Sequence, residues 1–309
     1  MSEKTAIKPQ LRKLDIKAML KNYLQALAFM SPFLFGMIIF WIYPFINVMV
    51  ISLKEGYSIL TGNFNAYGFG NYQTIFNDVH FVSGLLNTGK YVLFVVPIST
   101  AIALLIATLL NNKIKFQGFF QTCYFLPLVT SVTAIGLVWR WIYNFDYGLL
   151  NYLLSLFNVG AINWLNNPAY NLIALVIYGV WAQLPYTIIL LLAGLQNINP
   201  QYYTAAKADG AKTTFIFFRI TVPLLAPTLG LTVIVNTIFS SQVFTELFPL
   251  FNGKPGAAYS LYTVVYYLYE KFYVKWDLGP AAASAMILFA IILSFTIIQM
   301  IIQRRWKHY

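Results

Sequence analysis

The sequence predicts an all-α integral membrane protein that crosses the membrane six times and keeps both termini in the cytoplasm. Hydrophobic residues make up 59% of the 309-residue chain and charged residues only 9%, a balance typical of membrane proteins. Six long apolar runs supply the crossings, and the distribution of lysine and arginine sets their direction. The net charge of +11 does not indicate nucleic-acid binding, because the basic residues flank apolar runs instead of forming a stripe on a soluble domain.

Each apolar run is long enough to cross a hydrocarbon core of about 30 Å, which takes roughly 20 helical residues. Uninterrupted runs favour helices over the alternating pattern of a β-barrel. The first run is too long for the core of a signal peptide and lacks a small-x-small cleavage site after it, so we expect it to be retained. The predicted spans are Leu24–Leu53, Leu85–Leu110, Gly118–Tyr143, Asn171–Leu195, Thr221–Val243 and Ala281–Gln303.

Lysine and arginine concentrate at both ends of the chain and in every second loop. By the positive-inside rule these segments are cytoplasmic. We therefore predict a basic cytoplasmic tail over residues 1–22, a transmembrane domain over residues 23–309, and a cytoplasmic position for loop 199–220. The residues concerned are Lys4, Lys8, Arg12, Lys13, Lys17, Lys21, Lys113, Lys115, Lys207, Lys212, Arg219, Arg304, Arg305 and Lys307.

Two predicted external loops, Lys54–Gly84 and Glu246–Pro280, are longer than simple turns require. We expect short helices in them, above all near the tyrosine-rich Ser260–Phe272. Tyrosine and tryptophan concentrate where helices meet the membrane surface. The patch therefore fits anchoring in the interface as well as contact with an external partner, and both interpretations stay open.

The loop between the fourth and fifth spans carries signals for a structured element. Asn199 is a suitable helix cap, and Pro200 fits the first helical position because it has no N–H to satisfy. The helix is expected to run to about Asp209, where Gly210 supplies a left-handed stop, before a second amphipathic piece over Thr213–Arg219. An ordinary connection needs neither caps at both ends nor an alanine-lined face, so the loop indicates docking of a cytoplasmic partner.

Sequence signatures of catalysis and metal binding are missing. Only two histidines occur, His80 and His308, far apart in polar segments, so no metal cluster is indicated. The fragment Gly210–Thr213 resembles the end of a phosphate-binding loop but lacks the upstream glycine. No credible Ser/His/Asp set exists. We therefore expect no catalytic residue, no metal and no cofactor bound by this chain, and no ATP hydrolysis of its own.

Polar side chains at membrane depth are costly without partners, which makes them candidates for a solute pathway. A neutral polar lining with aromatic rings fits a sugar better than an ion, although a helix–helix hydrogen bond explains each residue at least as well. Gln183 could also satisfy the backbone carbonyl that Pro185 frees. Arg140, flanked by two tryptophans, is expected to reach the interface instead. The pathway candidates are Gln183, Asn236, Gln242 and Glu246.

The segment Thr204–Pro227 closely resembles the cytoplasmic EAA signature of permease subunits in binding-protein-dependent ABC importers. The stretch just upstream, WAQLPYTIILLLAGLQNINP, looks like the carbohydrate-uptake branch of that family. The leading glutamate of the signature is Thr204 here, which loses or replaces an acidic contact, and Val222 stands in place of a leucine. The matching residues are Ala205, Ala206, Asp209, Gly210, Ala211, Phe217, Ile220, Pro223 and Pro227.

The resemblance implies a type I importer permease fold in a bacterial cytoplasmic membrane, working by alternating access. This chain and a second, different permease would form the pathway. Two cytoplasmic ABC ATPases would bind ATP and Mg²⁺, and an extracellular binding protein would deliver a sugar. The helix Pro200–Asp209 would be the coupling helix, and the ATPase-coupling residues would be Thr204, Ala205, Ala206, Asp209, Gly210, Ala211, Phe217, Ile220 and Pro223.

Two alternatives accompany this hypothesis. Within the importer family, the cargo could be a phosphorylated polyol or another small polar solute. Outside it, an ATP-independent secondary transporter would usually carry membrane-buried acidic residues or internal repeats. The acidic residues near the predicted spans, Asp146 and Glu246, lie past their outer ends, and no repeat is visible.

Overall fold

The computed structural model describes residues 16–111 and 117–306, in two units, Met1–Val50 and Ile51–Tyr309. Most of the predicted basic tail lies outside the described residues, as does the second histidine. The first unit is an apolar helix with a π-helical turn in its middle, and it begins earlier than the predicted Leu24. It consists of α1 (Ile16–Met37), the turn Ile38–Ile42 and all but the end of α2 (Tyr43–Ser52).

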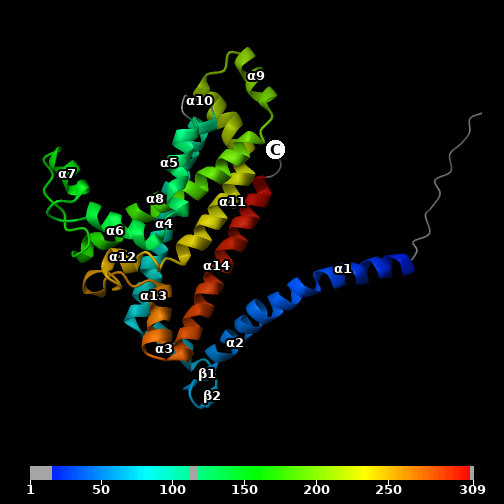
Figure 1. Cartoon of the computed structure of the whole chain (residues 1–309), viewed down its shortest axis with the longest axis vertical. Helices are drawn as coiled ribbons and strands as arrows, with labels where there is room; N and C mark the ends of the chain where they lie inside the picture. Colours follow the sequence, from blue (N-terminus) through cyan, green and yellow to red (C-terminus); the bar gives the residue numbers. More distant parts are fainter. Residues whose placement is uncertain (1–15, 112–116, 307–309) are drawn as a thin grey trace, which may run out of the picture. The chain divides into compact units, whose positions relative to one another are not determined.

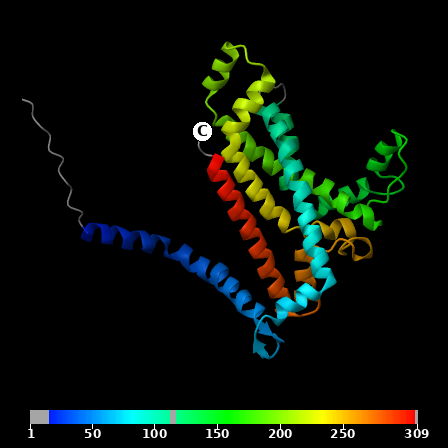
Figure 2. The same cartoon turned by 180° about the vertical axis from the view of Figure 1, so that it is seen from behind.

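Four long helices form the body of the second unit. They are α4 (Val79–Asn111), α8 (Pro168–Gln196), α11 (Val222–Ser241) and α14 (Leu278–Trp306). Among the described elements α4 and α8 share the most extensive contact, and α11 packs against α4, α8 and α14. Figures 1 and 2 show this bundle from opposite sides. Each of the four helices is long and apolar enough to cross a membrane, if α11 is counted together with the helical turns that precede it.

The contact between α4 and α8 depends on a glycine. A Cβ atom at Gly179 would lie 2.1 Å from the hydroxyl oxygen of Tyr91, far inside van der Waals contact. Tyr91 and its neighbour across the interface, Tyr178, belong to one buried hydrophobic cluster. The missing side chain lets the ring of Tyr91 reach the backbone of α8, so the two helices pack closely.

The predicted third span, Gly118–Tyr143, is broken in the structure. α5 (Gln117–Val129) and α6 (Val132–Ile142) meet at an angle of 113°, because Ser131 takes an extended ψ of 132° instead of continuing the helix. Pro127, in the last turn of α5, also removes a backbone hydrogen bond. The described residues hold five continuous candidate spans, or six if the bent pair counts as one. The composition gives no sign of this break, since both halves are apolar.

Shorter elements lie at the two ends of the second unit and to one side of it. α9 (Pro200–Ala208) and α10 (Thr213–Ile216) lie at one end, and the opposite end carries α3 and α13 (Figure 1). The short helices expected near Ser260–Phe272 are present as α13 and a π-helical turn. The remaining short elements are β1 (Lys54–Glu55) paired antiparallel with β2 (Ala66–Tyr67), α3 (Gly70–Asn77), α7 (Leu149–Ser155), α12 (Leu247–Phe251), the 3-10 turn Ala257–Tyr259, α13 (Val264–Tyr269) and the π-helical turn Glu270–Val274.

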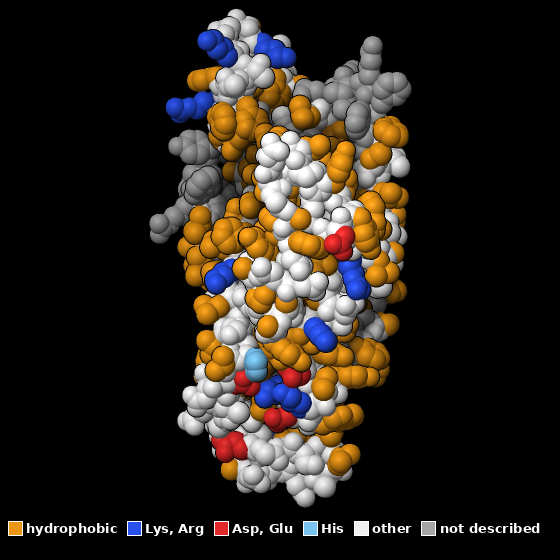
Figure 3. Space-filling view, turned by 90° about the vertical axis from the view of Figure 1, so that its left-hand side faces the viewer, with side chains coloured by type: hydrophobic (Ala, Val, Ile, Leu, Met, Phe, Trp, Pro, Cys, Tyr) orange, Lys and Arg blue, Asp and Glu red, His pale blue; other side chains and the backbone are white. Residues whose placement is uncertain are grey.

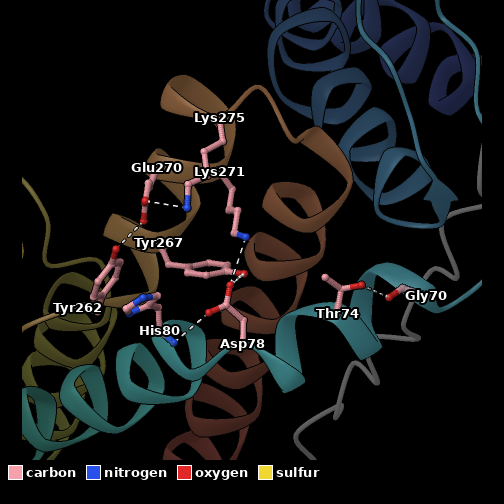
Figure 4. A network of polar contacts seen from close by, with 9 residues as sticks. All are labelled: Gly70, Thr74, Asp78, His80, Tyr262, Tyr267, Glu270, Lys271 and Lys275. Atoms are coloured by element: carbon pink, nitrogen blue, oxygen red, sulfur yellow. Dashed lines mark hydrogen bonds and ion pairs between the residues drawn. The ribbon is translucent and has the colours of Figure 1, made fainter. Parts of the chain in front are cut away.

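An ionic network ties α13 and the turn after it to the junction of α3 and α4 (Figure 4). The carboxylate of Asp78 accepts hydrogen bonds from the backbone N–H of His80 at 3.0 Å and from the hydroxyl of Tyr267 at 2.9 Å. The ammonium of Lys271 lies 3.2 Å from the same carboxylate. Segments almost two hundred residues apart in the sequence are thereby joined at this end of the bundle.

A second carboxylate, Glu270, completes the network. It accepts a hydrogen bond from the hydroxyl of Tyr262 at 2.7 Å and pairs with Lys275 at 2.9 Å. The ring of Tyr262 also stacks on the imidazole of His80, with ring centroids 4.5 Å apart. These contacts hold the long predicted external loop Glu246–Pro280 against the start of α4.

Acidification is expected to destabilise this end of the protein. Burial raises the pKa of Asp78, but the hydrogen bonds from His80, Tyr267 and Lys271 outweigh it and hold the pKa below its ordinary value. A carboxyl group whose pKa is lowered in the folded state contributes stability at a pH above its unfolded-state pKa. That contribution is lost as the pH falls through its folded-state pKa. Asp78→Asn is therefore expected to lower the free energy of unfolding by about 2 kcal/mol at neutral pH.

Thermal melting of the purified protein between neutral and acidic pH measures this effect. The melting temperature of the Asp78→Asn variant should depend less on acid than that of the unmodified protein. Asp146→Asn, which changes an exposed carboxylate outside the network, is the matched control. Equal acid sensitivity in the unmodified protein and the Asp78→Asn variant would contradict the role assigned to Asp78.

Candidate functional site

The loop between α8 and α11 begins with a capped helix. The side-chain oxygen of Asn199 accepts the backbone N–H of Gln201 at 2.9 Å, and Pro200 occupies the first position of α9. The hydroxyl of Thr204 donates to the carbonyl of Pro200 at 3.2 Å, within the same helix. The predicted N-terminal cap is confirmed, and Asn199 satisfies one of the otherwise unpaired N–H groups of the first turn.

The C-terminal end of α9 has the hydrogen bonds of a Schellman motif. Gly210 takes a left-handed φ of +74°, and its N–H donates to the carbonyl of Lys207 at 3.1 Å. The N–H of Ala211 donates to the carbonyl of Ala206 at 3.0 Å. These two bonds define the motif, in which glycine is favoured because it lacks a Cβ atom. The predicted stop at Gly210 is therefore confirmed.

The loop is anchored on the helix bundle. Ile198 and Tyr203 pack against a buried hydrophobic cluster built from α4, α8 and α11, which includes Leu191 and Leu225. Further along the loop, Ile216 of α10 is also buried. A π-helical turn then continues directly into α11. Through Ile198 and Tyr203 the start of the loop therefore shares one hydrophobic cluster with α4, α8 and α11.

The segment between α8 and α11 exposes apolar side chains. Tyr202 of α9 and Phe215 of α10 are 54% and 55% exposed, and Phe218, in the π-helical turn before α11, is 67% exposed. The two alanines of the expected face differ in exposure: Ala205 is exposed whereas Ala206 is buried. Successive helical residues point about 100° apart, which accounts for the different exposure of the two neighbours. The coupling role of both alanines stays a prediction.

The remaining coupling candidates fall into two groups by exposure. Thr204, Asp209, Gly210 and Pro223 are exposed, and so are available to a partner. Ala211, Phe217 and Ile220 are partly buried, in positions that shape the loop. Eight of the nine candidates lie in the loop at one end of the bundle and Pro223 lies in the first turn of α11. Their contact with an ATPase stays a prediction.

A polar cluster lies between α4, α8 and α11, with Gln183 at its centre. The side-chain oxygen of Gln183 accepts the hydroxyl of Ser99 at 3.0 Å. Its amide nitrogen donates to the hydroxyl of Ser240 at 2.7 Å and to the carbonyl of Asn236 at 3.3 Å. Both amide protons are thus used, so the expectation that Gln183 satisfies the carbonyl freed by Pro185 is wrong. The residue joins three helices instead.

Asn236 belongs to the same cluster and is completely buried. Its amide donates to the hydroxyls of Thr187 at 3.0 Å and Thr100 at 3.4 Å, and its oxygen accepts from Thr187 at 3.3 Å. Gln242 and Glu246 lie apart from this cluster. Gln242 is exposed at the end of α11, and Glu246 accepts the N–H of Phe244 at 3.1 Å. A role of these residues in a solute pathway stays a prediction.

Two buried asparagines that sequence reasoning passed over hold the loops between the longer helices. Asn151 and Asn171 are at most 6% exposed, and each makes several hydrogen bonds to backbone groups of distant residues. An asparagine beside an apolar run is an ordinary helix cap, so the sequence offers no signal for this role. Within the described residues, no group of three side chains is suited to a metal ion.

The fold and the loop define the membrane-spanning subunit of a transporter: a bundle of long apolar helices with one anchored, capped loop at its end. Residues 99–308 match the family described as the binding-protein-dependent transport system inner membrane component, and the chain belongs to this family. It is a multi-pass protein of the cytoplasmic membrane. The resemblance inferred from Thr204–Pro227 is thereby confirmed.

Several relatives are named as sugar transport permeases. The chain is 32% identical to the lactose transport system permease protein LacF of Rhizobium radiobacter, over 86% of this chain and 90% of the relative. It is 31% identical to the arabinooligosaccharides permease protein AraP of Bacillus subtilis, over 90% and 88%. Against the trehalose/maltose permease protein MalF of Thermococcus litoralis the identity is 32%, over 88% and 91%.

Solved structures share the fold. A chain of a bacterial alginate ABC transporter, solved in complex with an alginate pentasaccharide-bound periplasmic protein, superposes with a TM-score of 0.81 at 20% identity. The superposition covers 94% of this chain and 98% of that chain. The predicted type I importer permease fold is therefore confirmed, and at this identity the likeness concerns the fold alone.

Proposed function

We propose that this chain is one of two permease subunits of an ATP-driven importer for a sugar or oligosaccharide. An extracellular binding protein delivers the solute, and two cytoplasmic ABC ATPases bind ATP and Mg²⁺ and drive the cycle. Membership of a binding-protein-dependent family and sugar-transporting relatives over most of the chain support this function. The partner permease is a different chain in this proposal.

The observation that carries the proposal is the loop with α9. It is capped at both ends, its residues Ile198 and Tyr203 lie at the hydrophobic cluster of α4, α8 and α11, and it exposes Tyr202, Phe215 and Phe218. Exposed apolar side chains on a rigid support are typical of a protein docking surface. Closure of the ATPase pair would move this loop as a rigid body. The helices attached to it would then open the pathway alternately to the two sides of the membrane.

Affinity purification in mild detergent, followed by reconstitution into proteoliposomes, tests the function. We expect a soluble ATPase and a second multi-pass protein to accompany the chain, and uptake of a labelled oligosaccharide to require ATP and the binding protein. Competition by unlabelled solutes separates a sugar from a phosphorylated polyol or another small polar solute. Uptake that persists without ATP or any ATPase would overturn the proposal in favour of a secondary transporter.

A further inference from the structure

A polar cavity of about 480 Å³ opens where three loops of the second unit meet. The loops follow α6, α7 and α12, and α9 lies at a distant end of the bundle (Figures 1 and 2). Figure 3 looks onto this side of the unit, where polar and charged side chains interrupt the hydrophobic surface. We call it the outer cavity, since the charge distribution predicts these loops to be external. Its lining includes Arg140, Asp146, Asn166, Asn252, Lys254 and Tyr259.

The walls of the outer cavity are fixed by the buried Asn171. Its side-chain oxygen accepts the N–H of Ala257 at 2.7 Å and the hydroxyl of Ser260 at 3.0 Å. Its amide donates to the carbonyls of Trp164 at 3.2 Å and Leu165 at 3.0 Å. One side chain therefore ties the wall before α8 to the wall formed by the 3-10 turn.

Asn151 fixes the third wall in the same manner. Its amide donates to the carbonyls of Phe145 at 3.1 Å and Ile162 at 2.9 Å. Its oxygen accepts the indole N–H of Trp164 at 2.9 Å. Since buried amides lose their hydrogen bonds if the loops separate, the cavity is a built, preorganised feature. Preorganisation of this kind favours binding of a ligand.

Strained backbone lies along one side of the cavity. Asn252, Ala258 and Tyr259 have φ values of 56°, 49° and 59°, in the left-handed region that is unfavourable for residues other than glycine. Such strain persists only where the surroundings impose it, and it gathers at ligand-binding and catalytic sites. Tyr259, the last of these residues, lines the cavity and is 58% exposed.

The chemistry of the lining suits a saccharide. Three polar side chains of the lining, those of Asp146, Asn166 and Lys254, make no hydrogen bond or ion pair with other described residues. They are therefore available to the hydroxyl groups of a ligand. Tyr259 offers an aromatic face, against which the apolar face of a sugar ring can stack. Arg140 is already held by the side chain of Asn252. The volume lies within the range of small-molecule sites, about 300–1,000 Å³.

We propose that the outer cavity binds an oligosaccharide on its way from the binding protein to the membrane pathway. The proposal rests on the proposed sugar import and adds a binding site on this chain. Asp146 accepts hydrogen bonds from hydroxyl groups, Asn166 accepts or donates them, Lys254 donates, and Tyr259 stacks. The rival occupant is a lobe of the binding protein itself, which the test distinguishes.

Thiol protection in the reconstituted transporter tests the site. Cys123, the single cysteine of the chain, is replaced by serine, and Asn166→Cys is labelled with a water-soluble maleimide, without binding protein. The probes are maltotriose, a neutral trisaccharide, and trigalacturonate, an acidic one. If neither is transported, the sugar that the uptake assay identifies is used in their place. Asn63→Cys, on an exposed external turn outside the cavity, is the matched control.

We expect the transported sugar to slow labelling at residue 166 and to leave labelling at residue 63 unchanged. In the labelling background, Lys254→Gln should raise the half-protecting sugar concentration about fivefold, as loss of one hydrogen bond predicts. Unchanged labelling in a preparation that shows ATP-driven uptake would overturn the cavity site and leave the proposed function standing. Protection by the binding protein alone, without sugar, would also overturn it, because the cavity would then be a protein contact.

Discussion

Gly210→Asp and Ala206→Asp are expected to reduce ATP-driven uptake to the background seen without ATP, while the protein still inserts into the membrane. Gly210 has a φ of +74°, where any side chain strains the C-terminal cap of α9. Ala206 is a buried residue of α9. Burying a carboxylate at this position without a partner costs several kcal/mol, unless the loop moves to expose it. Both changes therefore displace the surface that we propose for ATPase docking.

A third variant separates docking from the integrity of the loop. Ala205→Asp changes an exposed position of α9 and leaves both caps in place, so its melting temperature should stay close to that of the unmodified protein. Its co-purification with the ATPase and its uptake should nevertheless fall. The same substitution at exposed Ala66, at the opposite end of the unit, is the control. Uptake as fast as in the unmodified protein by all three loop variants would contradict the coupling role of this loop.

The caps of α9 could be predicted from the sequence because they depend on neighbouring residues. Asn199 bonds two residues along the chain, and Gly210 needs only its own missing side chain. The exposure of Ala206 could not be predicted in this way. Its burial depends on how the segments around α9 fold, and an alanine pattern is compatible with an inward or an outward position. The family signature identifies the loop but not its outer face.

Contacts between distant segments account for what the sequence did not reveal. The break at Ser131 lies between two apolar helices, so hydropathy reports one span where the structure has two segments. Asn171 reaches backbone groups on both sides of the outer cavity, one of them 86 residues away. A single sequence carries no record of such pairing. The sequence also does not decide the role of polar residues at membrane depth, because a solute pathway and a helix–helix hydrogen bond require the same kinds of side chain.

Asn236→Leu is expected to lower the stability of the bundle and to leave the KM for uptake unchanged. Asn236 is completely buried and bonds Thr187 and Thr100 across two helix interfaces. Interhelical hydrogen bonds in membranes are worth about 0.6 kcal/mol on average and about 1.7 kcal/mol at most. Losing two of them should cost about 1–3 kcal/mol of unfolding free energy. Gln242→Leu, an exposed amide at the end of the same helix, is the control.

Melting temperatures and uptake kinetics, measured on the same preparations, decide between the two interpretations of Asn236. Thr187→Val removes the hydrogen bonds between Asn236 and Thr187 by changing the other partner. The double variant Asn236→Leu/Thr187→Val should therefore lose less stability than the sum of the losses in the two single variants. If instead Asn236→Leu left the melting temperature unchanged and raised KM, the residue would face the solute in another state of the transport cycle. The buried cluster would then be a closed part of the pathway, because side chains that hold three helices together in one state can bind sugar hydroxyls only after those helices separate.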